Sequence, residues 1–126
     1  MTWNRTGLLL PILLLLLLSG CATTPSGEDK AKRLKQAAKA NVQLGIAYMR
    51  DGEMEMSLKK FQKALDQDPE LASAHFFLAL AQKTFGEYEE ALRDFEEAHR
   101  VSADSSEALG RIGDCHHQLG RVRGVP

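Results

Sequence analysis

The pattern of apolar, small and polar positions repeats along most of the chain. Segments that begin at Asn41, His75 and Leu109 match one another when they are stacked 34 residues apart (41 to 75, 75 to 109). Between them no strand-like alternation or hairpin dipeptide appears, and Ala, Leu, Lys, Glu and Gln dominate after residue 31, so the pattern predicts helices. The clearest matching positions are Leu44, Leu78 and Ile112; Gly52, Gly86 and Gly120; and Phe61 and Phe95.

This repeat resembles the tetratricopeptide repeat, a helix–turn–helix unit with a period of 34 residues. The second unit departs from the family pattern at Gln82, where an aromatic residue is usual, and at Ala103, where proline is usual. The resemblance implies an all-α fold, with helical hairpins stacked into a right-handed α-solenoid of about two and a half repeats. In the first unit the family's positions are occupied by Leu44, Gly45, Tyr48, Ser57, Phe61, Ala64 and Pro69.

The physical roles of these positions follow from their size and backbone freedom. The first helix of each unit is expected to end at Gly52 or Gly86, because glycine adopts the left-handed conformation at low cost. Small residues let the two helices approach closely, while Leu44, Tyr48 and Phe61 are expected to fill the space between them. One unit cannot bury its apolar face alone, so the units must stack.

These expectations divide the chain into segments. Residues 38–71 form the first repeat, residues 72–105 the second, and residues 106–126 a partial third with only its first helix. That helix is expected from about Ser106 to Leu119, with Gly120 as its turn. Either it caps a small domain or the chain is a truncated form of a longer array, and we favour truncation because at least three units are usual.

The N-terminal region predicts where the protein is located. The apolar run from Leu8 to Leu18 covers 11 residues, whereas a transmembrane helix needs roughly 20. With Arg5 before it, the run is typical of a secretory signal peptide over residues 1–20. Its end, Leu-Ser-Gly-Cys at 18–21, resembles the lipobox of bacterial lipoproteins, which implies cleavage before Cys21 and a lipid on that cysteine. The alternative is an ordinary signal followed by a chance cysteine.

The resemblance also implies the destination of the lipidated chain. Residue 22 is alanine, not aspartate, which implies the outer membrane, with the protein facing the periplasm. Residues 21–37 would then comprise the lipidated linker and the start of the N-terminal helix.

In the tetratricopeptide repeat family the first helix of each unit lines the concave face. The positions carried over to this chain form an apolar strip that we expect to be exposed and to bind an apolar helix or strand of a protein partner. Alternatively, residues 28–37 fold over this strip, or further repeats bury it. Family members that grip a C-terminal carboxylate have lysine and asparagine here, so no such clamp is expected. The strip consists of Val42, Ile46, Met49, Phe76 and Leu80.

Composition and motif spacing argue against other functions. The formal net charge is −1, which gives no basic surplus for nucleic acid. Side chains of Cys115, His116 and His117 point about 100° apart on a helix and cannot converge on one metal ion. Cys115 aligns with small residues in the other units and is expected to be packed. Because no catalytic set or phosphate loop stands out, we expect no enzyme, no metal and no cofactor beyond the covalent lipid.

A second resemblance suggests a pathway. A lipobox, a short linker and the sequence from residue 38 to residue 82 look like type IV pilus biogenesis/stability lipoproteins. These are pilotins, which help the outer-membrane secretin reach its membrane and assemble its ring. The resemblance implies that a secretin or another envelope assembly component is the partner. The alternatives are a scaffold for outer-membrane protein assembly or cell-wall synthesis and, less favoured, a ligand- or metal-binding lipoprotein.

Overall fold

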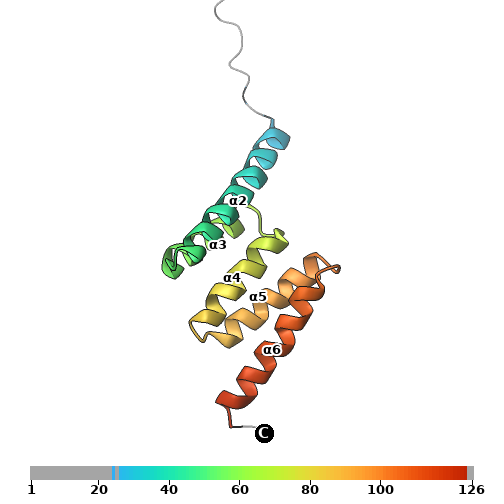
Figure 1. The fold of residues 1–126 in the computed structure, drawn as a ribbon. Helices are drawn as coiled ribbons and strands as arrows, with labels where there is room; N and C mark the ends of the chain where they lie inside the picture. Colours follow the sequence, from blue (N-terminus) through green and yellow to red (C-terminus); the bar gives the residue numbers. More distant parts are fainter. Residues whose placement is uncertain (1–23, 25, 125–126) are drawn as a thin grey trace, which may run out of the picture.

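The described part of the protein is entirely helical. The computed structural model describes residue 24 and residues 26–124, so the signal segment and Cys21 lie outside the described residues. Figure 1 shows the helices following one another in chain order down an elongated stack. The predicted all-α fold of helical hairpins is confirmed. The helices of the described residues are α2 (Gly27–Arg50), α3 (Met54–Gln67), α4 (Ala72–Thr84), α5 (Tyr88–Val101) and α6 (Ser106–Val122).

Two tight glycine turns close the hairpins α2–α3 and α4–α5. Gly52 has a φ of 82° and Gly86 a φ of 78°, which are left-handed values that favour glycine over any residue with a Cβ atom. The N–H of Gly52 donates to the carbonyl of Met49 at 3.2 Å, and the N–H of Gly86 donates to that of Lys83 at 3.0 Å. Both glycines therefore make the turns that the repeat pattern predicts.

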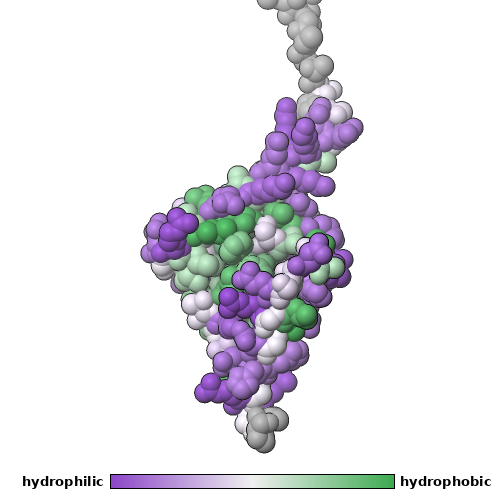
Figure 2. Space-filling view, turned by 45° about the vertical axis from the view of Figure 1, so that its right-hand side comes forward, coloured by the Kyte–Doolittle hydropathy of each residue, from purple (hydrophilic) through white to green (hydrophobic). Residues whose placement is uncertain are grey.

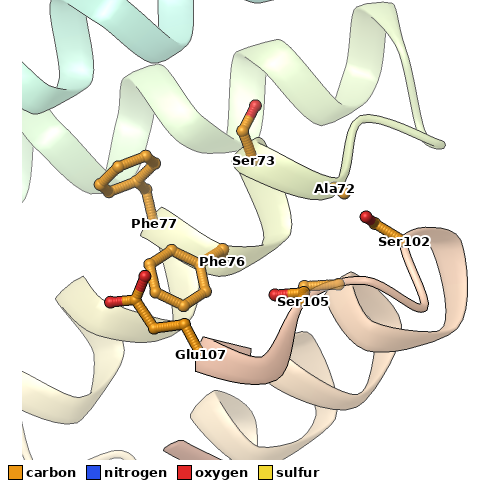
Figure 3. Close-up of a pocket in the computed structure, with 8 residues that line it drawn as sticks. Ala72, Ser73, Phe76, Phe77, Ser102, Ser105 and Glu107 are labelled. Carbon is orange, nitrogen blue, oxygen red and sulfur yellow. The ribbon is translucent and has the colours of Figure 1, made fainter. Parts of the chain in front are cut away.

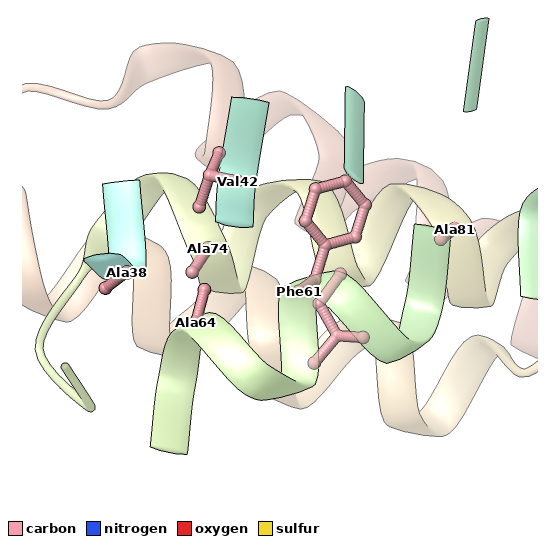
Figure 4. Packing of buried hydrophobic residues seen from close by; sticks show 7 residues of the cluster. Ala38, Val42, Phe61, Ala64, Ala74 and Ala81 are labelled. Carbon is pink, nitrogen blue, oxygen red and sulfur yellow. The ribbon is translucent and has the colours of Figure 1, made fainter. Parts of the chain in front are cut away.

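The first hairpin is joined to the second by one buried cluster. Its seven residues come from α2, α3 and α4, and the ring of Phe61 lies fully buried among small side chains (Figure 4). Because alanine dominates the contact surfaces, the helix axes can approach closely and exclude water. The cluster contains Ala38, Val42, Phe61, Ala64, Ala74, Leu78 and Ala81.

A second buried cluster continues the core toward the C-terminus. It comprises Ala79 of α4, Ala91 and Phe95 of α5, and Cys115 of α6, each with no exposed surface. Helix α4 therefore contributes to both clusters. The two clusters together extend the core from α2 to α6, as expected where neighbouring units bury each other's apolar faces.

Gly45 shows why the repeat needs a small residue at this position. A Cβ atom built on Gly45 would lie 2.5, 2.8 and 2.9 Å from three ring atoms of Phe61. Such distances are far inside van der Waals contact, so the ring occupies the space that a side chain at position 45 would need. The close approach of the two helices, predicted from the small residues, is confirmed here.

The expected positions of Leu44 and Gly120 within the repeat are wrong. Leu44 was expected inside the first hairpin but is 42% exposed. Its equivalent in the next unit, Leu78, is buried against the preceding hairpin, and in the described residues no helix precedes α2 to cover Leu44 in the same way. Gly120 lies within α6 and not in a turn, because the helix continues to Val122 and ends before Gly124, whose φ is 68°.

Helix α2 begins earlier than the repeat requires. Its 24 residues start at Gly27, where the hydroxyl of Ser26 accepts a hydrogen bond from the N–H of Asp29 at 3.3 Å. This is a standard N-terminal cap that satisfies one free N–H group. Residues 28–37 extend helix α2 away from the body in Figure 1, so the alternative in which they fold over the apolar strip is wrong.

Candidate protein-interaction face

The predicted apolar strip lies on helices α2 and α4, which with α6 form what we call the A-helix face. Ile46 and Met49 of α2 are half-buried against the first cluster. Phe76 and Leu80 of α4 are half-buried against the second cluster. Packing against the core holds these four side chains in place, and each keeps some exposed apolar surface. Such surface is available for contact with a partner.

Val42 was expected on this exposed strip, and that expectation is wrong. Its side chain is only 2% exposed and belongs to the first buried cluster together with Ala74 and Leu78 of α4. Because α4 packs against α2 at this level, the residue serves the joint between the two hairpins (Figure 4). Val42 therefore belongs to the core and has almost no surface to offer a partner.

An aromatic group links the strip to both buried clusters. The ring of Phe76 meets the rings of Phe77 and Phe95 edge-on, each with centroids 5.5 Å apart. Phe77 in turn stacks on Phe61, with centroids 5.9 Å apart and ring planes at 20°. Edge-on and offset contacts are the preferred aromatic geometries. Phe77 is absent from the predicted strip, although its position directly after Phe76 in the sequence is the signal that could have identified it.

An open cavity of about 240 Å³ lies beside these rings. Figure 3 shows Phe76 and Phe77 on one side and Ser102 and Ser105, from the α5–α6 connection, on the other. Glu107 of α6 adds a carboxylate to the lining. An apolar base with hydroxyl and carboxylate groups around it can accept one partner side chain that has an apolar body and a hydrogen-bonding end.

Charged residues border the apolar strip. Lys83 of α4 and Asp114 of α6 form an ion pair, with Nζ and Oδ2 3.4 Å apart. The pair joins neighbouring repeats across the A-helix face and adds little stability, because its partners are 25% and 58% exposed. Figure 2 shows apolar surface gathered on the body, with polar side chains around it and along the projecting part of α2. An apolar centre with a polar rim is the usual composition of a protein-binding surface.

His75 lies next to this face and has a structural role. Its Nδ1 is 2.9 Å from Oδ1 of Asp94 in α5, and its Nε2 is 2.9 Å from the carbonyl oxygen of Pro69. Neither a carboxylate nor a carbonyl oxygen can donate, so both ring nitrogens are satisfied only when the imidazole carries two protons. The hydrogen bond that the His75 ring donates to the Asp94 carboxylate raises the pKa of His75, and burial partly offsets this effect. His75 thus ties the α3–α4 connection to α5.

The cysteine and the two histidines of the cysteine–histidine run lie in different environments. Cys115 is fully buried in the second cluster, which confirms its predicted packing, and burial raises the pKa of its thiol. His116 and His117 are exposed. Across residues 26–124, no three His, Cys, Asp or Glu side chains come together as metal ligands. None of the described helices is both long and apolar enough to cross a membrane.

Comparison with known proteins identifies the fold independently. The second tetratricopeptide domain of Spaghetti (RPAP3), solved with an HSP90 peptide, superimposes with a TM-score of 0.68 and 25% identity, covering 74% of this chain and 86% of that one. The crystal structure of MamA has a TM-score of 0.65 at 23% identity, over 74% of this chain and 58% of MamA. The latter similarity concerns the fold alone.

Curated relatives are much longer than this chain. The type IV pilus assembly protein PilF of Pseudomonas aeruginosa is 36% identical over 95 residues, which are 72% of this chain and 36% of PilF. Superkiller complex protein 3 of Mus musculus is 34% identical over 79 residues, 63% of this chain but 5% of that protein. The tetratricopeptide repeat family model matches residues 36–104. The chain therefore belongs to the tetratricopeptide repeat family.

Proposed function

We propose that this chain is a lipid-anchored interaction module of the type IV pilus machinery. In this proposal a lipid on Cys21 holds it at the outer membrane, facing the periplasm, and the A-helix face binds an envelope assembly partner, specifically a segment of the secretin. The similarity to PilF and the lipobox-like residues 18–21 support the proposal. A binding role also agrees with the family, whose domains are scaffolds and typically non-catalytic.

The observation that carries the binding role is the set of half-buried apolar side chains beside an open cavity. Ile46, Met49, Phe76 and Leu80 are held by the core yet keep exposed surface, so binding would order few additional side-chain rotamers. An apolar or amphipathic helix or strand of the partner would lie along this strip, with one side chain in the cavity beside Phe76.

The lipid would contribute through geometry. A tether on Cys21 confines the A-helix face to a thin layer next to the membrane and raises its effective concentration toward partners in that membrane. An affinity that is modest in solution is then sufficient at the membrane surface. In this way the module would retain secretin subunits at the place where they assemble into a ring.

A capture experiment with a matched control tests the binding face. Secretin would be captured by the chain bearing Leu80→Glu and by the chain bearing Leu44→Glu. Leu80 is half-buried on the A-helix face, whereas Leu44 is 42% exposed on another side of α2. Both variants introduce the same charge, and circular dichroism would establish that each remains helical.

We expect Leu80→Glu to weaken binding of secretin by about tenfold or more, because burying a charge in an apolar contact costs more than roughly 1.4 kcal/mol. Leu44→Glu should retain it. Equal capture by the two variants would rule out the A-helix face as the binding surface. No capture by the unaltered chain would rule out the secretin as its partner.

A further inference from the structure

The first half of α2 carries a dense group of positive charges. Within ten residues, positions 30–39, it has five lysine or arginine side chains and no acidic one. We call this stretch the basic segment. Two acidic residues, Glu28 and Asp29, precede it in the first turn. Each cation is exposed, and within the described residues none takes part in an ion pair. The five are Lys30, Lys32, Arg33, Lys35 and Lys39.

Most of the basic segment projects beyond the packed body. Every residue from Gly27 to Gln36 is exposed, and the first buried residue of α2 is Ala38. Figures 1 and 2 show this half of the helix standing clear of the hairpins, with polar side chains around it. Folding of the repeats accordingly does not explain these cations, since all five are exposed and none forms an ion pair with the body among the described residues.

The distribution of the cations around the helix favours a broad charged surface over a shaped acidic peptide. Lys32, Lys35 and Lys39 follow a spacing of three and four and share one side. Lys30 and Arg33, three residues apart, share another side. The cavity beside Phe76 is lined by residues of α4, α5, α6 and the α5–α6 connection and not by the basic segment. Long lysine and arginine side chains from both sides can reach one plane of anionic headgroups.

We propose that the basic segment lies against anionic phospholipid headgroups of the membrane that holds the lipid on Cys21. This inference rests on the lipid anchor of the proposed function. Six residue steps separate Cys21 from the start of α2 at Gly27, and an extended chain covers at most about 20 Å over that distance. The tether thus keeps the basic segment close to the headgroups, where each cation strengthens contact by about fivefold.

The test uses the full chain reconstituted into vesicles of phosphatidylcholine, with or without phosphatidylglycerol. Amide hydrogen exchange would be followed for residues 28–37 by mass spectrometry, and the intact mass would show whether Cys21 carries its lipid. We expect slower exchange of this segment only in vesicles that contain phosphatidylglycerol. High salt should reverse the effect, because it shortens the range of electrostatic attraction to about 3 Å at 1 M.

Charge variants separate a specific contact from overall charge. Replacing Lys32 and Lys35 with glutamine should weaken the contact by roughly 25-fold, from about fivefold for each cation. Replacing Lys59 and Lys63 of α3 with glutamine removes the same charge from another helix and should leave exchange of residues 28–37 unchanged.

The outcomes distinguish this inference from the anchor itself. Equal exchange in both kinds of vesicle, with the lipid mass present on Cys21, overturns the membrane contact and leaves the anchor intact. Protection in anionic vesicles without the lipid mass supports the contact and contradicts the anchor. If the segment stays unprotected in anionic vesicles but becomes protected when secretin is added, a protein surface is its partner and the inference is wrong.

Discussion

Replacing Gly45 with alanine tests the packing of the first hairpin most directly. The new Cβ atom would be placed 2.5 Å from the nearest ring atom of Phe61. That ring is fully buried and stacks on Phe77, with centroids 5.9 Å apart, so it cannot turn aside freely. Either the two helices separate or the ring leaves its preferred rotamer, and both changes cost free energy.

Two opposing terms decide the free energy of unfolding of this variant. Alanine in a helix interior is favoured over glycine by about 0.5–1 kcal/mol. Overpacking of a well-packed core typically costs about 1–3 kcal/mol. At Gly45 the distances to Phe61 lie far below contact, so the packing cost exceeds the helix preference. We expect Gly45→Ala to destabilise the protein by about 1 kcal/mol.

Gly113 provides the matched control. It occupies the same repeat position in α6, since 113 is 45 plus twice 34, but nothing lies within 4 Å of a Cβ atom built there. Gly113→Ala should therefore stabilise by about 0.5–1 kcal/mol. Urea unfolding followed by circular dichroism would measure both variants, and the gap between them of about 2 kcal/mol corresponds to roughly 8–16 °C in Tm.

The reasoning would be refuted if both alanine variants stabilised the protein to the same extent. That result would mean that the first hairpin is loose enough to accept a methyl group at position 45. Packing against Phe61 would then not require glycine at this position. A double variant with Phe61→Leu gives a further check, because a smaller side chain at position 61 should remove most of the cost of Gly45→Ala.

Three further outcomes can be checked by the same unfolding assay. The pKa of His75 is raised above its usual 6.5. The protonated imidazole therefore contributes fully to stability below pH 6.5, and this contribution is lost as the pH rises through the raised pKa. Asp94→Asn should flatten this pH dependence in urea titrations. Cys115→Ser places an extra polar group in a fully buried site and should cost about 1–3 kcal/mol, more than Cys115→Ala. Gly86→Ala puts a Cβ on a backbone with φ of 78° and should lower Tm by roughly 4–8 °C, for a cost of about 1 kcal/mol.

The fold was predictable because the repeat carries its signals locally. Gly52 and Gly86 form the turns, and Phe61 and Phe95 are fully buried at equivalent positions. Matching residues therefore have the same structural role in both repeats. The wrong expectation for Leu44 has a different origin. Leu78, at the same repeat position, is buried against the preceding hairpin, so this position packs between units and not inside its own hairpin. Among the described residues no earlier helix covers Leu44, and its own sequence does not reveal this.

The candidate face was predictable only in part. Positions 46, 49, 76 and 80 carry half-buried apolar side chains where the family pattern expects them, whereas Val42 lies too close to α4 to remain exposed. The family pattern describes an average repeat, whereas the burial of one side chain depends on the helix that packs against it in this chain. The ion pair between Lys83 and Asp114 was also inaccessible to sequence reasoning, since it depends on how α4 and α6 are set side by side.

Helix α4 has a consequence for how the protein loses its structure. It supplies Ala74, Leu78 and Ala81 to one hydrophobic cluster and Ala79 to the other, so neither can persist once this helix melts. Disorder that starts within α4 must therefore spread into both hairpins. The two hairpins should therefore denature as a single cooperative transition, with α4 as the element whose protection reports global opening.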